Sequence, residues 1–155
     1  MTIRTGLLFS LLFLLISGFQ CFAKEIQTST DLLNEIAHAS KKQVVLVNFY
    51  ASWCSPCRQE IADLIEIRKT FSQEQLKIIG INLDENEETM LSFNRDIGIN
   101  YETYHDFQGQ ISGFFNFQGI PFNIIYGKNG KAVYAQSGSI PFEKLSDLIE
   151  YGLTK

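Results

Sequence analysis

The sequence predicts an α/β domain built around a mixed β-sheet. An apolar run that begins at Val44 leads into an amphipathic segment, and a second apolar run follows at residues 75–84. Two buried strands joined by a helix are expected to pair in parallel through a right-handed connection. Further along, Asn129 and Gly130 stand between two strand-like runs, which is a strong signal of an antiparallel hairpin. The chain has 155 residues, 45% of them hydrophobic, so it holds one ordinary globular domain and whatever precedes it.

The first half of the domain is expected to run helix, strand, helix. A first helix is expected within residues 27–40, and the central strand starts at Val44 and breaks at the turn of residues 53–57. A helix then continues to about Phe71, because apolar side chains recur at helical spacing. Its apolar stripe consists of Ile61, Leu64, Ile65 and Phe71, and the charged Arg58, Glu60, Asp63, Glu66 and Lys69 are expected largely on other faces.

The second half is expected to add a helix, a hairpin and a final helix. After the second strand, an acidic turn leads into a helix that ends at Gly98, a residue type that commonly terminates helices. Residues 101–117 are aromatic-rich and irregular, with a short helix expected at about residues 110–116. The hairpin follows, and residues 141–151 form the last helix.

Residues 1–23 are expected to be an export signal, which leaves residues 24–155 as the domain. Arg4 supplies the positive start, residues 7–16 the apolar stretch, and Ala23 ends a tolerable cleavage site. The net charge of −4 becomes −5 when Arg4 is removed with the signal. A domain of this charge is not suited to binding nucleic acid.

Two alternatives apply to the N-terminal segment. Residues 6–22 can serve as an uncleaved anchor, since they reach the lower limit, about 17 residues, of a membrane span. Lipid attachment at Cys21 is disfavoured by the bulky residues before it. The expected location is therefore periplasmic or extracytoplasmic, with the domain either soluble after cleavage or anchored to the membrane.

Cys54 and Cys57 are the candidate catalytic residues. Pro56 between them suits a first helical turn, so both sulfurs lie where a strand ends and a helix begins. Unpaired N–H groups and the helix dipole favour a thiolate there, which makes Cys54 the natural nucleophile. Cys57, one turn further on, can then attack a mixed disulfide formed at Cys54 and release the product.

Two other roles for the cysteine pair, a zinc site and a structural disulfide, are disfavoured. A zinc site needs about four ligands, and the only other candidates, Cys21, His38 and His105, are not paired at ligand spacing. A purely structural disulfide is disfavoured because a loop this short constrains little chain. We therefore expect no metal and no cofactor other than a redox-active Cys54–Cys57 disulfide.

The order of elements, together with residues 53–57 and the later Ile120–Pro121 pair, resembles the thioredoxin fold. The resemblance covers nearly all of residues 24–155 and implies a central mixed sheet with helices on both faces. It also implies that Pro121 is cis and lies against the cysteine loop. Trp53, Ile120 and Pro121 are then the expected substrate-binding residues.

Within that fold the chain resembles the exported TlpA/ResA-like thiol:disulfide oxidoreductases, which include the cytochrome c maturation proteins. The export signal, Asn48 in the central strand and the run at residues 81–85 carry this resemblance. It implies that Glu85 manages the proton of Cys57. Phe122 and Asn123 replace the threonine pair common after the cis proline, so the substrate stays open.

The expected function is reduction of disulfides in exported proteins, with apocytochrome c as one possible client. Pro56 precedes the second cysteine, as in thioredoxins, where strongly oxidising DsbA-like proteins carry histidine. An exported reductant needs a membrane electron donor of the DsbD or CcdA kind, and we expect a monomer. The alternatives are an oxidant or isomerase of the same fold, a peroxiredoxin, which Ala51 disfavours by lacking a hydroxyl, and a non-enzymatic binding module or chaperone.

Overall fold

The structure, a computed structural model, describes residues 29–155. The expected export signal, the alternative anchor and Cys21 lie outside the described residues. Within residues 29–155, no helix combines the length and the apolar character that crossing a membrane requires.

The core of the molecule is a five-stranded mixed sheet in the order β3-β2-β1-β4-β5. Strand β1 pairs in parallel with β2, which pairs in parallel with β3, whereas β4 and β5 are antiparallel additions on the other side. The predicted mixed sheet and its hairpin are therefore confirmed. The strands are β1 (Val44–Tyr50), β2 (Leu76–Asn82), β3 (Glu102–His105), β4 (Phe122–Tyr126) and β5 (Ala132–Ser137).

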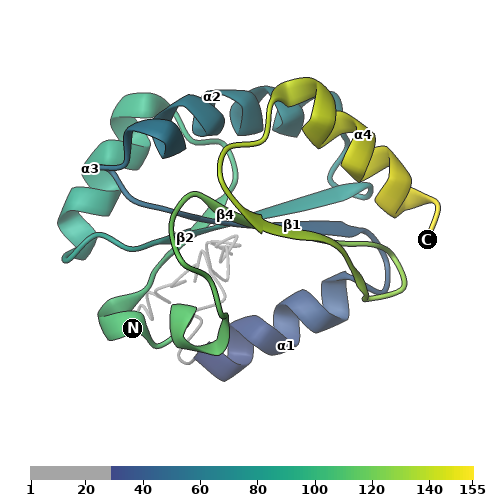
Figure 1. The fold of residues 1–155 in the computed structure, drawn as a ribbon, viewed down its shortest axis with the longest axis horizontal. Coiled ribbons are helices and arrows are strands. Elements are labelled where there is room, and N and C mark those ends of the chain that lie inside the picture. The colour runs from purple at the N-terminus through teal and green to yellow at the C-terminus, as the bar shows by residue number, and fades with distance from the viewer. Residues whose placement is uncertain (1–28) are drawn as a thin grey trace, which may run out of the picture.

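Helices cover both faces of this sheet (Figure 1). One face carries α2, α3 and α4, and the opposite face carries α1 and two short 3-10 helices, η1 and η2. This arrangement agrees with the expectation of helices on both faces. The helices are α1 (Ser29–Ala39), α2 (Ser55–Thr70), α3 (Glu87–Ile97), η1 (Phe107–Gly109), η2 (Ser112–Phe114) and α4 (Phe142–Leu153).

Strand β1 is buried along its whole length, and its side chains alternate between the two faces. Leu46 packs into the cluster beneath α2 and α4, whereas Val47 and Phe49 pack into the cluster on the α1 side. Asn48 therefore points toward α2. A polar side chain in the middle of this strand thus lies under the helix that begins at the cysteines.

Glycines stand at the end of α3 and in the hairpin turn, where the sequence predicts them. Helix α3 ends at Gly98, which adopts the left-handed conformation with φ of 78°. Gly130 in the hairpin turn has φ of 75°, which a residue with a side chain rarely adopts. The last helix also agrees with its prediction, with Leu145 and Ile149 buried.

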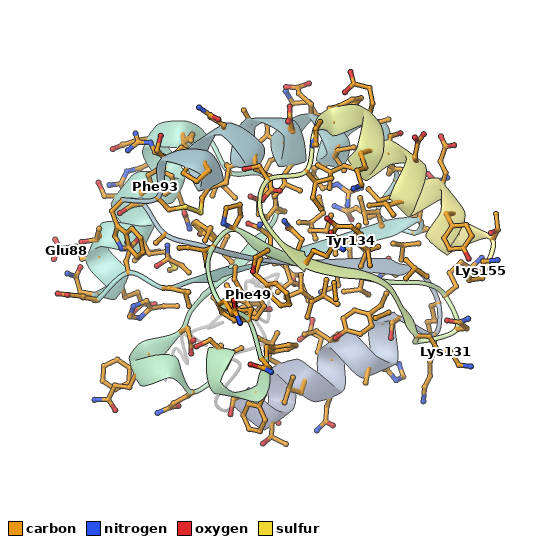
Figure 2. All side chains as sticks on the ribbon, viewed as in Figure 1. Phe49, Glu88, Phe93, Lys131, Tyr134 and Lys155 are labelled. Atoms are coloured by element: carbon orange, nitrogen blue, oxygen red, sulfur yellow. A yellow bond between two sulfur atoms is a disulfide. The ribbon has the colours of Figure 1, made fainter. Side chains whose placement is uncertain are left out.

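The segment of residues 101–117 differs from its prediction. Instead of one helix at residues 110–116, it contains strand β3 and the two 3-10 helices. Strand β3 is short and polar, so the sequence has no apolar run that would predict it. It is defined by its parallel pairing with β2. The aromatic side chains that follow pack around Phe49, which is labelled in Figure 2. The rings of Phe115 and Phe117 lie 5.0 and 4.9 Å from that of Phe49.

Candidate active site

Cys54 and Cys57 are joined by a disulfide at the start of α2. Cys54 is the N-cap residue, and its Sγ accepts a hydrogen bond of 3.2 Å from the backbone N–H of Cys57. Pro56 occupies the first helical turn, as predicted. A negative charge on the Cys54 sulfur would therefore meet a directed N–H group and the positive end of the helix dipole.

The two sulfurs differ in access. Cys57 is completely buried, whereas Cys54 keeps 5% of its surface exposed. Trp53, directly before Cys54, is 69% exposed. Of the two cysteines, Cys54 is therefore the one that a partner can reach, and the exposed ring of Trp53 lies next to it in the chain.

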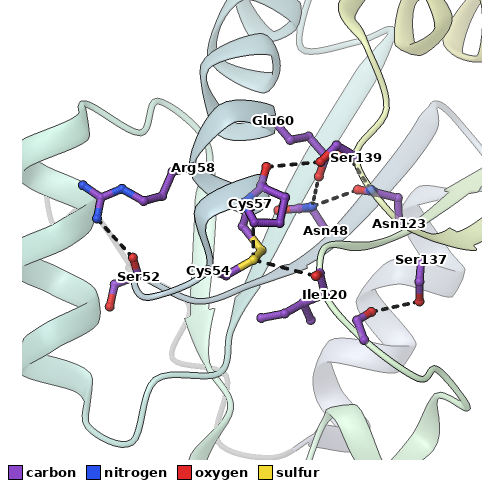
Figure 3. Close-up of a disulfide and its surroundings, with 12 residues drawn as sticks. Asn48, Ser52, Cys54, Cys57, Arg58, Glu60, Ile120, Asn123, Ser137 and Ser139 are labelled. Carbon is purple, nitrogen blue, oxygen red and sulfur yellow. Dashed lines mark hydrogen bonds between the residues drawn. A yellow bond between two sulfur atoms is a disulfide. The ribbon is translucent and has the colours of Figure 1, made fainter.

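The Ile120–Pro121 pair lies across from the cysteines, and its peptide bond is cis. The carbonyl oxygen of Ile120 lies 3.7 Å from Sγ of Cys54 (Figure 3). The carbonyl of Pro121 accepts a hydrogen bond of 2.8 Å from the N–H of Gly138, which ties this loop to the end of β5. The structure thus brings Ile120 and Pro121 to Cys54 from a distant part of the chain.

The turn that carries the cysteines is anchored by Asp84, just beyond β2. The carboxylate of Asp84 is buried and accepts hydrogen bonds from the backbone N–H and the hydroxyl of Ser52, at 3.1 and 2.9 Å. The N–H of Cys54 donates to the carbonyl of Ala51 at 3.2 Å. Both attachments hold the turn in place before any partner arrives.

Glu85, the next residue, is exposed. It lines a hollow of about 370 Å³ together with Asp84 and the turn that follows β3, and neither cysteine belongs to that lining. Its role in managing the proton of Cys57 stays a prediction.

Glu60 is the acidic side chain that the structure buries behind the cysteines. It lies on α2 one turn after Cys57 and is 1% exposed. Its carboxylate accepts hydrogen bonds of 2.9 Å from Nδ2 of Asn48 and of 2.9 Å from Nδ2 of Asn123 (Figure 3). It also accepts one of 2.7 Å from the N–H of Ile140. The expectation that Glu60 lies on another face of the helix is wrong.

The surroundings of Glu60 act on its protonation in opposite directions. Burial raises the pKa of the Glu60 carboxyl to about 7, although the hydrogen bonds from Ile140, Asn123 and Asn48 favour the charged form and oppose that rise. A carboxyl group with this pKa exchanges protons at neutral pH. General acid or base chemistry is most efficient under that condition.

Two signals in the sequence bear on Glu60. Residues three apart on a helix are neighbours, so Glu60 and Cys57 share a face. Asn48 is a polar residue in an otherwise apolar strand, and a buried amide needs a polar partner. Neither signal identifies which of the several acids on α2 is that partner, because the answer depends on how the helix is rotated against the sheet.

Comparison with known proteins places this site in a family. The model of the AhpC/TSA family matches residues 22–135. The chain belongs to the AhpC/TSA family. This match covers the cysteine turn, both flanking strands and the cis-proline segment.

Individual relatives carry a more specific name. The "Thiol-disulfide oxidoreductase ResA" of Bacillus subtilis (strain 168) is 23% identical over 107 residues, which cover 69% of this chain and 60% of that protein. The protein of the same name from Oceanobacillus iheyensis is 21% identical over 123 residues, covering 79% and 62%. The chain thus spans about three fifths of the length of these curated relatives.

Solved structures show the same fold. A thiol:disulfide interchange protein of the thioredoxin family from Chlorobium tepidum TLS superposes with a TM-score of 0.68 at 24% identity, covering 76% of this chain and 84% of that one. StoA from Bacillus subtilis superposes with a TM-score of 0.62 at 19% identity, covering 69% and 82%. The predicted thioredoxin fold is confirmed.

Proposed function

We propose that this protein is a thiol:disulfide oxidoreductase that reduces disulfides in exported proteins. The placement of the Cys54 sulfur carries the proposal, since it lies between the N–H of Cys57 and the carbonyl of Ile120. The first group stabilises a thiolate at Cys54. The second is a backbone acceptor that an extended client segment can pair with while its own disulfide approaches that sulfur. The relatives named thiol-disulfide oxidoreductase support this assignment.

The reaction begins with the reduced enzyme. The Cys54 thiolate attacks one sulfur of the client disulfide, the client S–S bond breaks, and the second client sulfur leaves as a thiolate. A mixed disulfide now joins Cys54 to the client. Trp53, Ile120 and Pro121 form the contact surface for the client during this step.

The second step releases the client. Cys57 gives its proton to the Glu60 carboxylate, and its thiolate attacks Sγ of Cys54. The mixed disulfide breaks, the remaining client sulfur leaves with the electron pair, and the proton passes to it. Two electrons have moved to the client, and the enzyme holds the Cys54–Cys57 disulfide. This disulfide is the only redox group that the mechanism uses.

The proposal extends to the setting of the enzyme. It acts as a monomer in the periplasm or another extracytoplasmic space, either free after removal of residues 1–23 or anchored by residues 6–22. Its Cys54–Cys57 disulfide is reduced again by a membrane electron donor of the DsbD or CcdA kind. The proposal includes apocytochrome c as a client, because the resemblance extends to the cytochrome c maturation proteins.

A trapping experiment tests the mechanism. Reduced Cys57→Ser is incubated with a peptide that contains one intramolecular disulfide, and the products are weighed by mass spectrometry. The variant should accumulate an adduct equal to protein plus peptide, because the resolving thiol is gone. The matched Cys54→Ser variant, which keeps the buried sulfur of Cys57 at the site, should form almost no adduct at Cys57. If Cys57→Ser forms no adduct while its Cys54 still reacts with iodoacetamide, the mechanism is wrong.

The competing functions differ in simple assays. A peroxidase would consume hydrogen peroxide at the expense of the cysteines, and we expect little consumption, because Ala51 offers no hydroxyl to a bound peroxide. A non-enzymatic binding module would retain its function in the double variant Cys54→Ala/Cys57→Ala. We expect that variant to lose all disulfide reduction.

A further inference from the structure

One side chain, that of Asn123, connects the cis-proline segment with the buried carboxylate of Glu60. Its Nδ2 donates to Oε1 of Glu60 at 2.9 Å, and its Oδ1 accepts from Nδ2 of Asn48 at 2.8 Å (Figure 3). Asn123 and Asn48 are completely buried, and Glu60 is 1% exposed. Both polar atoms of the Asn123 amide are therefore engaged within the site.

Strand register brings this contact about. Asn123 on β4 lies directly opposite Asn48 on β1 in the antiparallel pair. Because side chains alternate along a strand, Asn123 points toward α2 and its neighbour Ile124 packs into the cluster on the opposite face. Asn123 is also only two residues after Pro121. The segment that presents the Ile120 carbonyl to Cys54 is thus directly continuous with a hydrogen-bond donor to Glu60.

We propose that Asn123 is a positioning residue that orients the Glu60 carboxylate behind Cys57 and favours its ionised form, and so sets the pH at which the mixed disulfide is resolved. The proposal rests on the function proposed above. A hydrogen bond donated to a carboxylate favours its charged form, whereas burial favours the neutral form. Without the Asn123 donor, burial acts with less opposition and Glu60 holds its proton to higher pH.

The other titratable groups near Glu60 do not replace this donor. Asp63 on α2 is an acid that disfavours a second negative charge. Tyr101, before β3, and Tyr134, on β5, interact with Glu60 electrostatically. Among the described residues, the hydrogen bonds to the Glu60 carboxylate come from Asn48, Asn123 and the backbone of Ile140. Asn123 is therefore the side chain of β4, the strand that follows the cis-proline segment, that donates a hydrogen bond to this carboxylate.

Direct titration of Glu60 tests the proposal. Full-length oxidised protein is labelled with ¹³C at the glutamate carboxyls, and the Glu60 resonance is assigned by its loss in Glu60→Gln. In Asn123→Leu the midpoint should rise by about one to two pH units, as expected for loss of one hydrogen bond to a charged group. Asn123→Thr should shift it in the same direction, since its hydroxyl sits one bond nearer the backbone than the amide nitrogen. The β-branched side chain of threonine also suits a strand.

The control is Ile124→Val, a small change in the same strand that points to the other face. It should leave the Glu60 midpoint unchanged. An unchanged midpoint in Asn123→Leu and Asn123→Thr would overturn the proposal, as would an equal shift in Ile124→Val.

A kinetic readout separates this proposal from the proposed function. The pH profile for release of a Cys54–peptide mixed disulfide should move upward with the Glu60 midpoint in both Asn123 variants. The rate at which iodoacetamide alkylates Cys54 should keep its original pH profile. If Glu60→Gln leaves the release profile unchanged, the role of Glu60 in the proposed function is wrong. If Glu60→Gln alters release but the Asn123 variants do not, the role of Asn123 alone is wrong.

Discussion

At the scale of single residues, Glu60 and Glu85 occupy contrasting environments. Glu60 lies on the buried, sheet-facing side of α2, where burial raises the pKa of its carboxyl to about 7. Glu85 is exposed just beyond the end of β2. A buried acid with a raised pKa binds its proton more tightly in the folded chain than in the unfolded chain. The folded state is therefore favoured at low pH and loses that advantage as the pH rises through about 7.

This dependence of stability on pH leads to a prediction for Glu60→Gln. The stability contributed by protonated Glu60 is fully present below about pH 4 and is lost by about pH 8, a change of the order of 3 kcal/mol for its pKa of about 7. Glutamine does not titrate, so the variant should gain in unfolding free energy relative to the original protein between pH 5 and pH 8. Urea unfolding of the oxidised protein at both pH values measures the difference.

The matched control for this prediction is Glu85→Gln. An exposed substitution should change the unfolding free energy by no more than about 0.5 kcal/mol, equally at both pH values. If Glu60→Gln behaves in the same flat way, Glu60 is not the buried titrating group. The role of Glu85 in the thiol chemistry is a separate question, which the pH dependence of thiol alkylation in Glu85→Gln answers.

At the scale of elements, Gly80 on β2 leaves room for the rings of Tyr50 and Tyr101. Gly80 lies beside Asn48 in the parallel register. A Cβ atom at Gly80 would lie 3.0 Å from Cε1 of Tyr50 and 3.2 Å from both Cε2 of Tyr101 and Cγ2 of Thr103. The hydroxyl of Tyr50 donates to Asn94 at 2.7 Å, so its ring is held in place. The element thus requires glycine for close packing rather than for a turn.

Gly80→Ala is therefore expected to destabilise the fold by about 1–3 kcal/mol, the usual cost of forcing extra volume into a packed core. The measurement is the midpoint of urea unfolding at fixed pH. Gly113→Ala is the matched control, because no atom lies within 4 Å of a Cβ placed at Gly113. Equal effects of the two substitutions would show that the rings beside Gly80 move aside at no cost.

At the scale of the whole molecule, the direction of electron flow depends on how strongly the fold stabilises the reduced cysteines relative to their disulfide. The start of α2 favours a thiolate at Cys54, whereas a carboxylate at Glu60, one turn behind Cys57, opposes further negative charge. Pro56 also stands where strongly oxidising members of the fold carry histidine. The balance predicts a reductant, with a reduction potential below about −180 mV and nearer to thioredoxin at about −270 mV.

Equilibration with dithiothreitol or glutathione buffers, followed by thiol counting, measures this potential. Pro56→His should raise it, because a protonated histidine beside the sulfurs stabilises the reduced form. A potential above about −180 mV in the unmodified protein would contradict the prediction and place it among the oxidants and isomerases.

Local patterns in the sequence predict most elements of this fold. An apolar run, a proline in a helix start, a glycine after a helix and an Asn-Gly turn each act within a few residues. Strand β1, helix α2, strand β2, helix α3, the hairpin and helix α4 could therefore be predicted, as could the reactive cysteines. The pairing of Trp53–Cys57 with Ile120–Pro121 depends on distant residues, and only the resemblance to a known fold made it predictable.

The tertiary structure alone decided three features. Strand β3 is polar and short, and it forms because the exposed edge of β2 offers unpaired backbone groups. Glu60 is buried because the rotation of α2 against the sheet turns that acid, rather than Asp63 or Glu66, toward Asn48. Asn123 reaches Glu60 because antiparallel register sets it opposite Asn48, far away in the sequence. Each depends on packing between distant segments, which no local pattern of residues specifies.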